Sequence, residues 1–298
     1  MIQYDPHDWR AHLFDIKGSM LREILLRVML VVGWSVVVTV TYELWAGRKP
    51  ERVMLLAPTV HTLIGTALGL LLVFRTNSSY DRFWEGRRMW GNIINESRNL
   101  ARASGIQLAS VPELNQRVLG WLVCFSHASM HALQRRGELN LGPTADRLPP
   151  GEVAAAIAAD HVPLAVAGNI TRALQAARQQ GLLSDYLFVS LDQNVQLLVD
   201  YLGSCERIHS TPLPFAYMVH LRRLILLYCY TLPLALVQDF AWWTIPATLF
   251  VSYAFFGIEE IGVEIEDPFG SDDNDLPLES FCETIGRNVE EAGQGRQG

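Results

Sequence analysis

The chain has 298 residues, of which 50% are hydrophobic and 18% are charged, below the roughly 25% charged residues of ordinary soluble domains. This composition excludes a disordered, fibrous or low-complexity chain and favours a membrane protein. The four cysteines are scattered and form no CxxC pair, which argues against a disulfide framework or a cysteine-built zinc site.

Charge is distributed unevenly along the chain. The net charge is −7, yet residues 259–291 alone hold 12 Asp or Glu and one Arg, so the remainder of the chain carries +4. An acidic C-terminal segment behind a hydrophobic body lacks the basic face that nucleic acids require. We therefore expect no nucleic-acid partner.

The first hydrophobic region reads as a helical hairpin. Residues 28–42 contain no Asp, Glu, Lys or Arg, and residues 54–74 form an uncharged run of 21 residues. A bilayer-spanning helix needs about 20 such residues. The short polar sequence at 47–52 lies between the two runs, and this predicts two spans joined by a tight turn.

A second hairpin is predicted near the C-terminus. Residues 224–237 are apolar and interrupted by Pro233, and residues 240–258 are 19 uncharged residues that begin with a tryptophan pair. Gln238 and Asp239 mark the turn between them. Tryptophan is enriched at membrane interfaces. The sequence thus predicts four spans in two hairpins.

The remaining segments are predicted to lie outside the bilayer. Residues 1–27 lack a cleavage site and read either as an interfacial amphipathic stretch, with Trp9, Leu13 and Phe14 on its apolar side, or as a plain cytosolic lead-in. The insert shows helical periodicity and no alternating strand, so we predict an all-α membrane protein. Its Arg-rich flank at 75–102 favours the cytoplasmic side, which places both termini there as well.

The predicted segments are 1–27 (interfacial or cytosolic), 28–74 (transmembrane hairpin 1, with a pore-lining second helix), 75–215 (cytosolic helical domain), 216–258 (transmembrane hairpin 2) and 259–298 (acidic cytosolic segment). Within the insert, helices are expected at 75–102, 118–133, 152–160, 170–180 and 184–203. The uncharged run at 118–133 is too short to span a bilayer and is predicted to be a buried soluble helix.

One pair of residues has metal-ligand spacing. His127 and His131 stand four apart on one helical face, but no Glu follows the first His and no acidic third ligand lies nearby. Histidines satisfied by hydrogen bonds explain the pair better than a metal. No nucleophile elbow, phosphate loop or dinucleotide fingerprint occurs in the sequence.

The second span carries two helical stripes. Gly65 and Gly69 form a GxxxG pair, which permits close helix approach in lipid. Thr62, Thr66 and two apolar residues, Leu70 and Phe74, follow at steps of four. Such a stripe suits either helix packing or a hydrophobic pore constriction that gates by dewetting.

Three sequence blocks resemble the bestrophin family of ion channels, and its bacterial branch in particular. They are FRTNSSYDRFWEGRRMWG from residue 74, CERIHSTPLPFAY at 205–217, and EIEDPFGSDDNDLPL at 264–278. With the order hairpin, helical insert, hairpin, the resemblance covers nearly the whole chain.

The resemblance implies a homopentamer around one central pore, in which three apolar rings on the second transmembrane helix form a neck. The last ring directly precedes Arg75, so the rings fall on Thr66, Leu70 and Phe74. Thr66 departs from the bulky apolar residue usual at its position, which predicts a wider or wetter outer ring. The family's cytosolic aperture falls near Tyr186 or Leu187.

The resemblance also implies a calcium clasp after the fourth span. Asp272 and Asp275 fall on its carboxylate positions, and Glu264 and Asp267 on positions that supply backbone carbonyls. Oxygen ligands at short spacing suit Ca²⁺. The cluster is thinner than in the animal proteins, and a solvated acidic turn that caps a helix remains the alternative.

The expected function is passive conduction of small monovalent ions, chloride or other anions in the animal branch and cations in the bacterial branch. The expected partners are other copies of the chain, membrane lipid and the permeant ions, in a cell inner membrane. No cofactor is required, apart from the Ca²⁺ candidate. The rival classes are a metal-dependent membrane enzyme that uses His127 and His131, and a membrane adaptor whose insert docks a partner.

Overall fold

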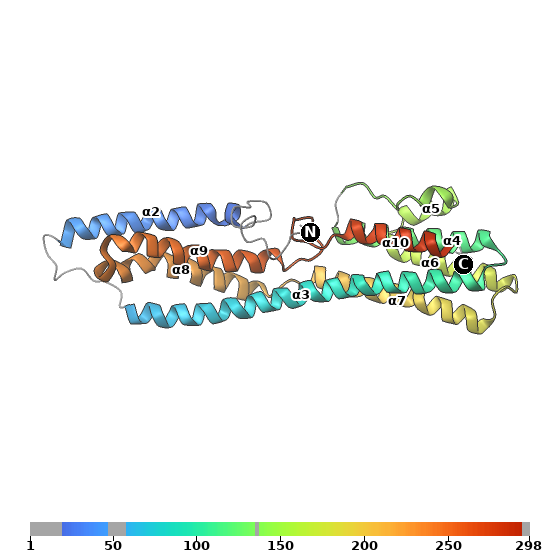
Figure 1. The fold of residues 1–298 in the computed structure, drawn as a ribbon, viewed down its shortest axis with the longest axis horizontal. Coiled ribbons are helices and arrows are strands. Elements are labelled where there is room, and N and C mark those ends of the chain that lie inside the picture. The colour runs from blue at the N-terminus through green and yellow to red at the C-terminus, as the bar shows by residue number, and fades with distance from the viewer. Residues whose placement is uncertain (1–19, 47–57, 135–136, 294–298) are drawn as a thin grey trace. The chain divides into compact units, whose positions relative to one another are not determined.

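The computed structural model describes residues 20–46, 58–134 and 137–293, and throughout these residues the regular structure is helical (Figure 1). The all-α prediction is confirmed for this part of the chain. The interfacial stretch predicted before Met20 and the predicted turn at 47–52 lie outside it. The helices are α2 (Leu21–Ala46), α3 (Pro58–Gln107), α4 (Pro112–Gln134), α5 (Pro150–Ile157), α6 (Val162–Gln179), α7 (Asp185–Ser210), α8 (Phe215–Phe240), α9 (Thr244–Glu264) and α10 (Leu278–Gly293).

The chain forms two compact units. The first comprises residues up to Phe83, residues 212–267 and residues 272–274; the second comprises residues 84–211, 268–271 and the chain from Asp275 onward. The long helix α3 contributes its first part to one unit and its second part to the other.

Helix α3 runs without interruption for 50 residues, whereas the sequence divided it at Phe74 into a span and a separate polar helix. The helix continues past Phe74 because residues 75–85 contain neither Pro nor Gly. Side-chain hydroxyls along this stretch donate to the carbonyl four residues earlier, as Thr76 does to Leu72 at 2.9 Å and Ser78 to Phe74 at 2.9 Å.

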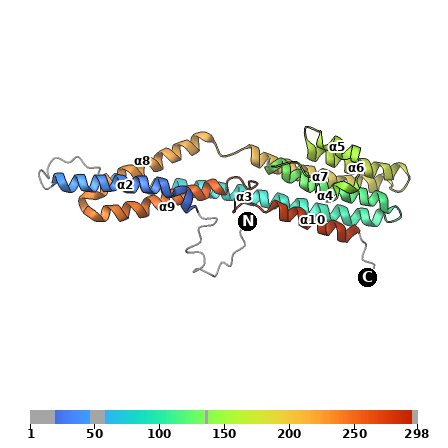
Figure 2. The same cartoon turned by 90° about the horizontal axis from the view of Figure 1, so that it is seen from above.

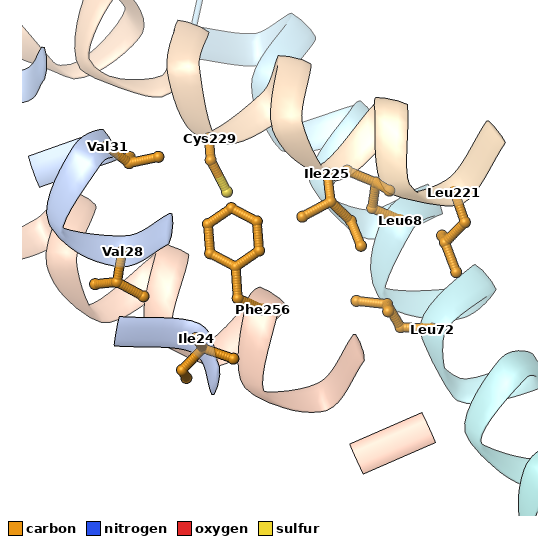
Figure 3. Close-up of a cluster of buried hydrophobic side chains, with 9 residues drawn as sticks. All are labelled: Ile24, Val28, Val31, Leu68, Leu72, Leu221, Ile225, Cys229 and Phe256. Atoms are coloured by element: carbon orange, nitrogen blue, oxygen red, sulfur yellow. The ribbon is translucent and has the colours of Figure 1, made fainter. Parts of the chain in front are cut away.

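In the first unit, α2 packs against α9 and α8. Figure 3 shows the centre of this packing, where the ring of Phe256 points toward Cys229. Side chains from four helices meet there, and each is 4% exposed or less. They are Ile24, Val28 and Val31 of α2, Leu68 and Leu72 of α3, Leu221, Ile225 and Cys229 of α8, and Phe256 of α9.

Helices α8 and α9 are joined by a single 3-10 turn, Ala241–Trp243. Ala241 has a φ of 45°, a conformation that L-residues seldom adopt, and it ends α8 where the chain reverses. Three helical stretches of the described chain are long and apolar enough to cross a membrane: Leu21–Trp45, Pro58–Gln107 and Phe215–Glu264. The third contains both α8 and α9.

The second unit is built around α4, which packs against α6 and α10 (Figure 2). Trp121, Leu122 and Phe125 of α4 are fully buried, as predicted for a soluble helix in this region. Helix α10 was not foreseen within the acidic segment, yet it buries Leu278, Cys282, Ile285 and Val289 along one face. This spacing of four, three and four is that of an amphipathic helix.

Candidate functional site: an exposed stripe on α3 and the charge cluster at its base

The predicted neck residues lie on one uncovered face of α3. Leu70 and Phe74 are each 57% exposed, and Thr66 one turn earlier is exposed as well. The side chains four apart on a helix share a face, so the three form a continuous stripe. Large apolar residues exposed in this way need a cover of lipid or of other copies of the chain, or else line a water-filled path.

The hydroxyl of Thr66 donates its proton within α3. This hydroxyl donates a 2.9 Å hydrogen bond to the carbonyl oxygen of Thr62, and the hydroxyl of Thr62 donates in the same way to Pro58 at 3.1 Å. The one proton of each hydroxyl is therefore used inside α3. The hydroxyl oxygens keep their acceptor lone pairs, and the wider or wetter outer ring stays a prediction.

Directly after the stripe, Arg75 points into the protein. Its side chain is 1% exposed, and its Nη1 donates to the Oε1 of Glu259 at 2.9 Å and to the backbone oxygen of Glu259 at 2.8 Å. Glu259 is 2% exposed. A buried charge is tolerated only when it is paired and hydrogen-bonded, so this ion pair ties α3 to α9 immediately below Phe74.

Two further arginines share the same carboxylate. The Nε of Arg222 on α8 donates to the Oε1 of Glu259 at 2.8 Å, and the Nη1 of Arg27 on α2 lies 3.5 Å from its Oε2. Arg27 also donates to Glu260 at 2.8 Å. One buried carboxylate thus connects α2, α3, α8 and α9, and we call Arg27, Arg75, Arg222 and Glu259 the charge cluster.

The three sequence blocks of the resemblance meet close to this cluster. The Oε1 of Glu266 accepts a hydrogen bond from the backbone N–H of Leu213 at 2.9 Å, and its Oε2 lies 3.7 Å from the Nη2 of Arg75. Arg82 donates to the backbone oxygen of Glu266 at 3.1 Å. The hydroxyl of Tyr217 donates to the carbonyl of Leu71 on α3 at 2.9 Å.

The two glycines of α3 differ in their surroundings. A Cβ built on Gly65 would lie 2.7 Å from the hydroxyl oxygen of Tyr228 on α8, whereas nothing lies within 4 Å of a Cβ on Gly69. Gly65 therefore permits a close approach between α3 and α8 within one chain. The predicted part of both glycines in assembly stays a prediction.

The predicted aperture residues lie in the first turn of α7. The hydroxyl of Ser184 caps this helix by accepting from the backbone N–H of Leu187 at 3.3 Å. Tyr186 is 90% exposed, and Leu187 is partly buried. A tyrosine this exposed is available to a pathway or to a neighbouring chain, and its assignment to the aperture stays a prediction.

The calcium-clasp residues divide between the two units. In the first unit, Asn274 hydrogen-bonds to Glu264, and Asp272 lies near enough to repel the Glu264 carboxylate. The Oε2 of Glu264 is buried, and the described residues offer it no hydrogen-bond partner. In the second unit, the 3% exposed Asp275 packs its carboxylate against Gly270. Asp267 has polar or electrostatic contacts of its own.

His127 and His131 do not form a metal site in this part of the chain. The ring of His127 packs against Gly142, which has a φ of 86°, and His131 pairs through Nε2 with the carbonyl of Gly137 at 3.2 Å. Among the described residues, no three His, Cys, Asp or Glu side chains lie close enough together to hold a metal ion. Burial outweighs the nearby charge of Glu279 and lowers the pKa of His127.

Sequence reasoning missed the charge cluster. It gave no role to Arg27, Arg222 or Glu259. A signal was present, because all three stand at the same kind of boundary between an uncharged span and a charged segment. Charged residues at such positions often pair with one another, but the sequence does not tell which ones do.

Apolar helices long enough to cross a membrane, an exposed apolar stripe along one of them and a buried charge cluster after it are features of a helical membrane protein. Residues 1–291 match the model of a protein family described as "Bacterial/Fungal Bestrophin protein". The chain is a member of this bestrophin family, so the resemblance predicted from the three blocks is confirmed.

Relatives of known name support the same assignment. The chain is 40% identical over 287 residues to the voltage-dependent anion channel-forming protein alr2987 of Nostoc, covering 95% of this chain and 91% of that one. It is 32% identical over 288 residues to the voltage-dependent anion channel-forming protein YneE of Escherichia coli K12, covering 96% and 91%.

Solved structures agree in fold. A crystal structure of a bacterial bestrophin homologue from Klebsiella pneumoniae, solved by zinc phasing, matches with a TM-score of 0.82 at 31% identity, covering 91% of this chain and 98% of that one. Family, relatives and fold point to an ion channel rather than an enzyme.

Proposed function

We propose that the chain assembles as a homopentamer and conducts small monovalent ions passively through a central pathway lined by α3. The observation that carries the proposal is the exposed stripe of Thr66, Leu70 and Phe74, held from behind by the buried pair of Arg75 and Glu259. Five copies of α3 would turn this stripe inward as three rings. A ring of bulky apolar side chains acts as a barrier to hydrated ions by dewetting.

The proposed membrane arrangement has four spans, formed by α2, the first part of α3, α8 and α9. The insert at 75–215 and both termini then lie on the cytoplasmic side of a cell inner membrane. The Arg-rich segment that follows the second span favours this side by the positive-inside rule. Tyr186 or Leu187 would form a second constriction in the cytosolic part.

The sign of the permeant ion has two supported alternatives. The names of the relatives, anion channel-forming proteins, favour anions. The 12 carboxylates of residues 259–291 favour cations where they face the pathway. An apolar neck discriminates little by itself, so charged groups outside it would set the selectivity.

Two measurements on the purified full-length chain test the proposal. Native mass spectrometry should give a single assembly of five chains, and vesicles loaded with a NaCl gradient should dissipate it only when the protein is present. The reversal potential in that gradient assigns the sign of the ion. A monomer, or vesicles that stay sealed, would overturn the channel proposal.

We also propose that Glu264, Asp267, Asp272 and Asp275 hold Ca²⁺ in a clasp, with no other cofactor required. The proposal rests on the resemblance to the calcium clasp of the animal channels, in which Asp272 and Asp275 would supply carboxylates and Glu264 and Asp267 would supply backbone carbonyls. Calcium that binds only the folded chain should raise the free energy of unfolding by about 2.7 kcal/mol at a hundredfold excess over the dissociation constant. The melting temperature should rise accordingly. If the melting curves in calcium and in chelator superimpose, the segment is only a charged turn and the calcium proposal is wrong.

A further inference from the structure

A cavity on the first unit has one charged end and one apolar end. It has a volume of about 230 Å³ and is lined by residues of α2, α8 and α9, with none from α3. Arg27, Arg222 and Glu259 form the charged end, and Ile225, Leu226 and Phe256 form the apolar end. Figure 3 shows Ile225 and Phe256 side by side in the packing of this unit. The cavity is thus separate from the proposed neck stripe.

The charged end presents cations rather than a carboxylate. The Glu259 side chain is 3% exposed, and its Oε1 is occupied by Arg75 and Arg222 at 2.9 and 2.8 Å. The side chains of Arg27 and Arg222, in contrast, are 44% and 51% exposed. Arg222 uses its Nε for Glu259, and among the described residues its two terminal nitrogens have no polar partner. Arg222 is thus the half-exposed cation available to an anion, whereas Arg27 also pairs with Glu260 at 2.8 Å.

The cavity lies where the uncharged parts of three helices end. Arg27 directly precedes the uncharged stretch of α2, Arg222 and Arg223 precede that of α8, and Glu259 follows that of α9. Charges at the ends of spanning helices lie at the depth of the lipid headgroups. Apolar side chains around the cavity are open to the outside, since Leu26 is 69% exposed and Leu227 is 63% exposed.

We propose that this cavity binds one anionic phospholipid, with the phosphate on Arg222 and Arg27 and an acyl chain against the apolar end, where Leu226 is 43% exposed and Ile225 and Phe256 are buried behind it. Guanidinium groups bind phosphate oxygens by two parallel hydrogen bonds. Phosphatidylcholine carries the same phosphate, but its quaternary ammonium neutralises the headgroup and would be repelled by the two arginines, so a net anionic headgroup is favoured. A small soluble anion would satisfy the charged end but leave the apolar end uncovered. The proposal requires the chain to lie in a membrane and does not depend on ion conduction.

The test uses the full-length assembly in detergent, titrated with phosphatidylglycerol or with phosphatidylcholine of the same acyl chains, and native mass spectrometry counts the bound lipid. The wild-type protein should retain phosphatidylglycerol in preference to phosphatidylcholine. Arg222→Gln should weaken this binding about fivefold, the factor that about 1 kcal/mol per basic residue implies. Arg222→Lys, which keeps the charge, should retain more lipid than Arg222→Gln. Arg223→Gln is the matched control on the same helix and should bind as wild type does.

Four results would overturn the proposal. Equal retention of both lipids would remove the headgroup specificity. Equal losses in Arg222→Gln and Arg223→Gln would reduce the effect to general surface charge. Inorganic phosphate that displaces the lipid completely at low millimolar concentration would identify a soluble-anion site. An Arg222→Gln chain that binds lipid normally but no longer assembles would identify the cavity as a contact between copies.

Discussion

The two units of the chain differ in how far their large apolar side chains are exposed. In the second unit Trp90, Trp121 and Phe125 are completely buried. In the first unit, α2 leaves Leu26 69% exposed and Leu30 55% exposed. The second unit therefore has the core of a water-soluble domain, whereas the first has an exterior suited to lipid or to neighbouring copies.

Both units bury polar side chains, but the buried ion pair lies in the first unit. The first unit buries the ion pair of Arg75 and Glu259, and the hydroxyl of Ser35 on α2 donates to that of Thr248 on α9 at 3.3 Å. Apolar surface provides no driving force between helices in lipid, so close packing and buried polar contacts must hold them together. Specific polar pairs should thus matter most in the first unit, and apolar volume in the second.

The largest expected effect is the loss of the shared carboxylate. Glu259→Ala removes the nearest carboxylate of the buried Arg75 and leaves only that of Glu266 at 3.7 Å, which should destabilise the fold by about 3–5 kcal/mol. Thermal unfolding of the purified chain measures the change. Glu260→Ala is the control, because among the described residues Glu260 pairs with the half-exposed Arg27, and it should cost about 0–1 kcal/mol. Equal effects of the two would contradict a special role for the cluster.

A matched pair of aliphatic truncations compares the two units directly. Ile285 of α10 is fully buried, so Ile285→Ala should cost about 2–4 kcal/mol through lost contacts and a cavity. Leu26→Ala on α2 removes an exposed side chain and should change stability by less than about 0.5 kcal/mol. Melting temperatures in one detergent give both values. A large loss for Leu26→Ala would mean that another copy covers it.

The glycines of α3 test close helix approach within one chain. Gly65→Ala places a methyl group against Tyr228 and should cost about 1–3 kcal/mol. Tyr228→Phe removes the hydroxyl that the methyl meets and should restore part of the loss. The methyl group of Gly69→Ala meets nothing among the described residues of its own chain, so its effect should appear in the assembly, measured by size-exclusion chromatography. Instability of monomeric Gly69→Ala would contradict this distinction.

The smallest expected effect is a pH dependence in the second unit. Burial lowers the pKa of His127, so the folded chain binds this proton less readily than the unfolded chain. The resulting loss of stability is absent above the ordinary pKa of 6.5 and grows as the pH falls below it. His127→Gln should show a smaller drop in melting temperature between pH 7.5 and 5.5 than wild type or His131→Gln. Parallel pH profiles would exclude His127 as the group responsible.

Much of the fold could be predicted from the sequence because long uncharged runs and helical periodicity are local signals. The spans at 28–42 and 240–258 were visible in this way, as was the buried helix that contains Trp121. Helix α10 was missed, because its many carboxylates hid the buried stripe of Leu278, Cys282 and Ile285. The continuity of α3 past Phe74 was missed because polarity changes there while helix propensity does not.

The candidate site was predictable only in part. The stripe of Leu70 and Phe74 follows from a spacing of four on one helix, and the resemblance gave it a role. The charge cluster joins residues as far apart as Arg27 and Glu259, and such pairing depends on tertiary packing that no local pattern encodes. The contact of Gly65 with Tyr228 is likewise a property of two helices together.

The most direct test of the central claim is single-channel recording of the neck variant Leu70→Ala with Phe74→Ala in planar bilayers. Both side chains are exposed in the single chain and would ring the pathway in the assembly. Their truncation removes the dewetted barrier, so the account predicts a larger unitary conductance than wild type, with the assembly of five chains intact. Unchanged conductance in an intact assembly would remove Leu70 and Phe74 from the pore and contradict the account.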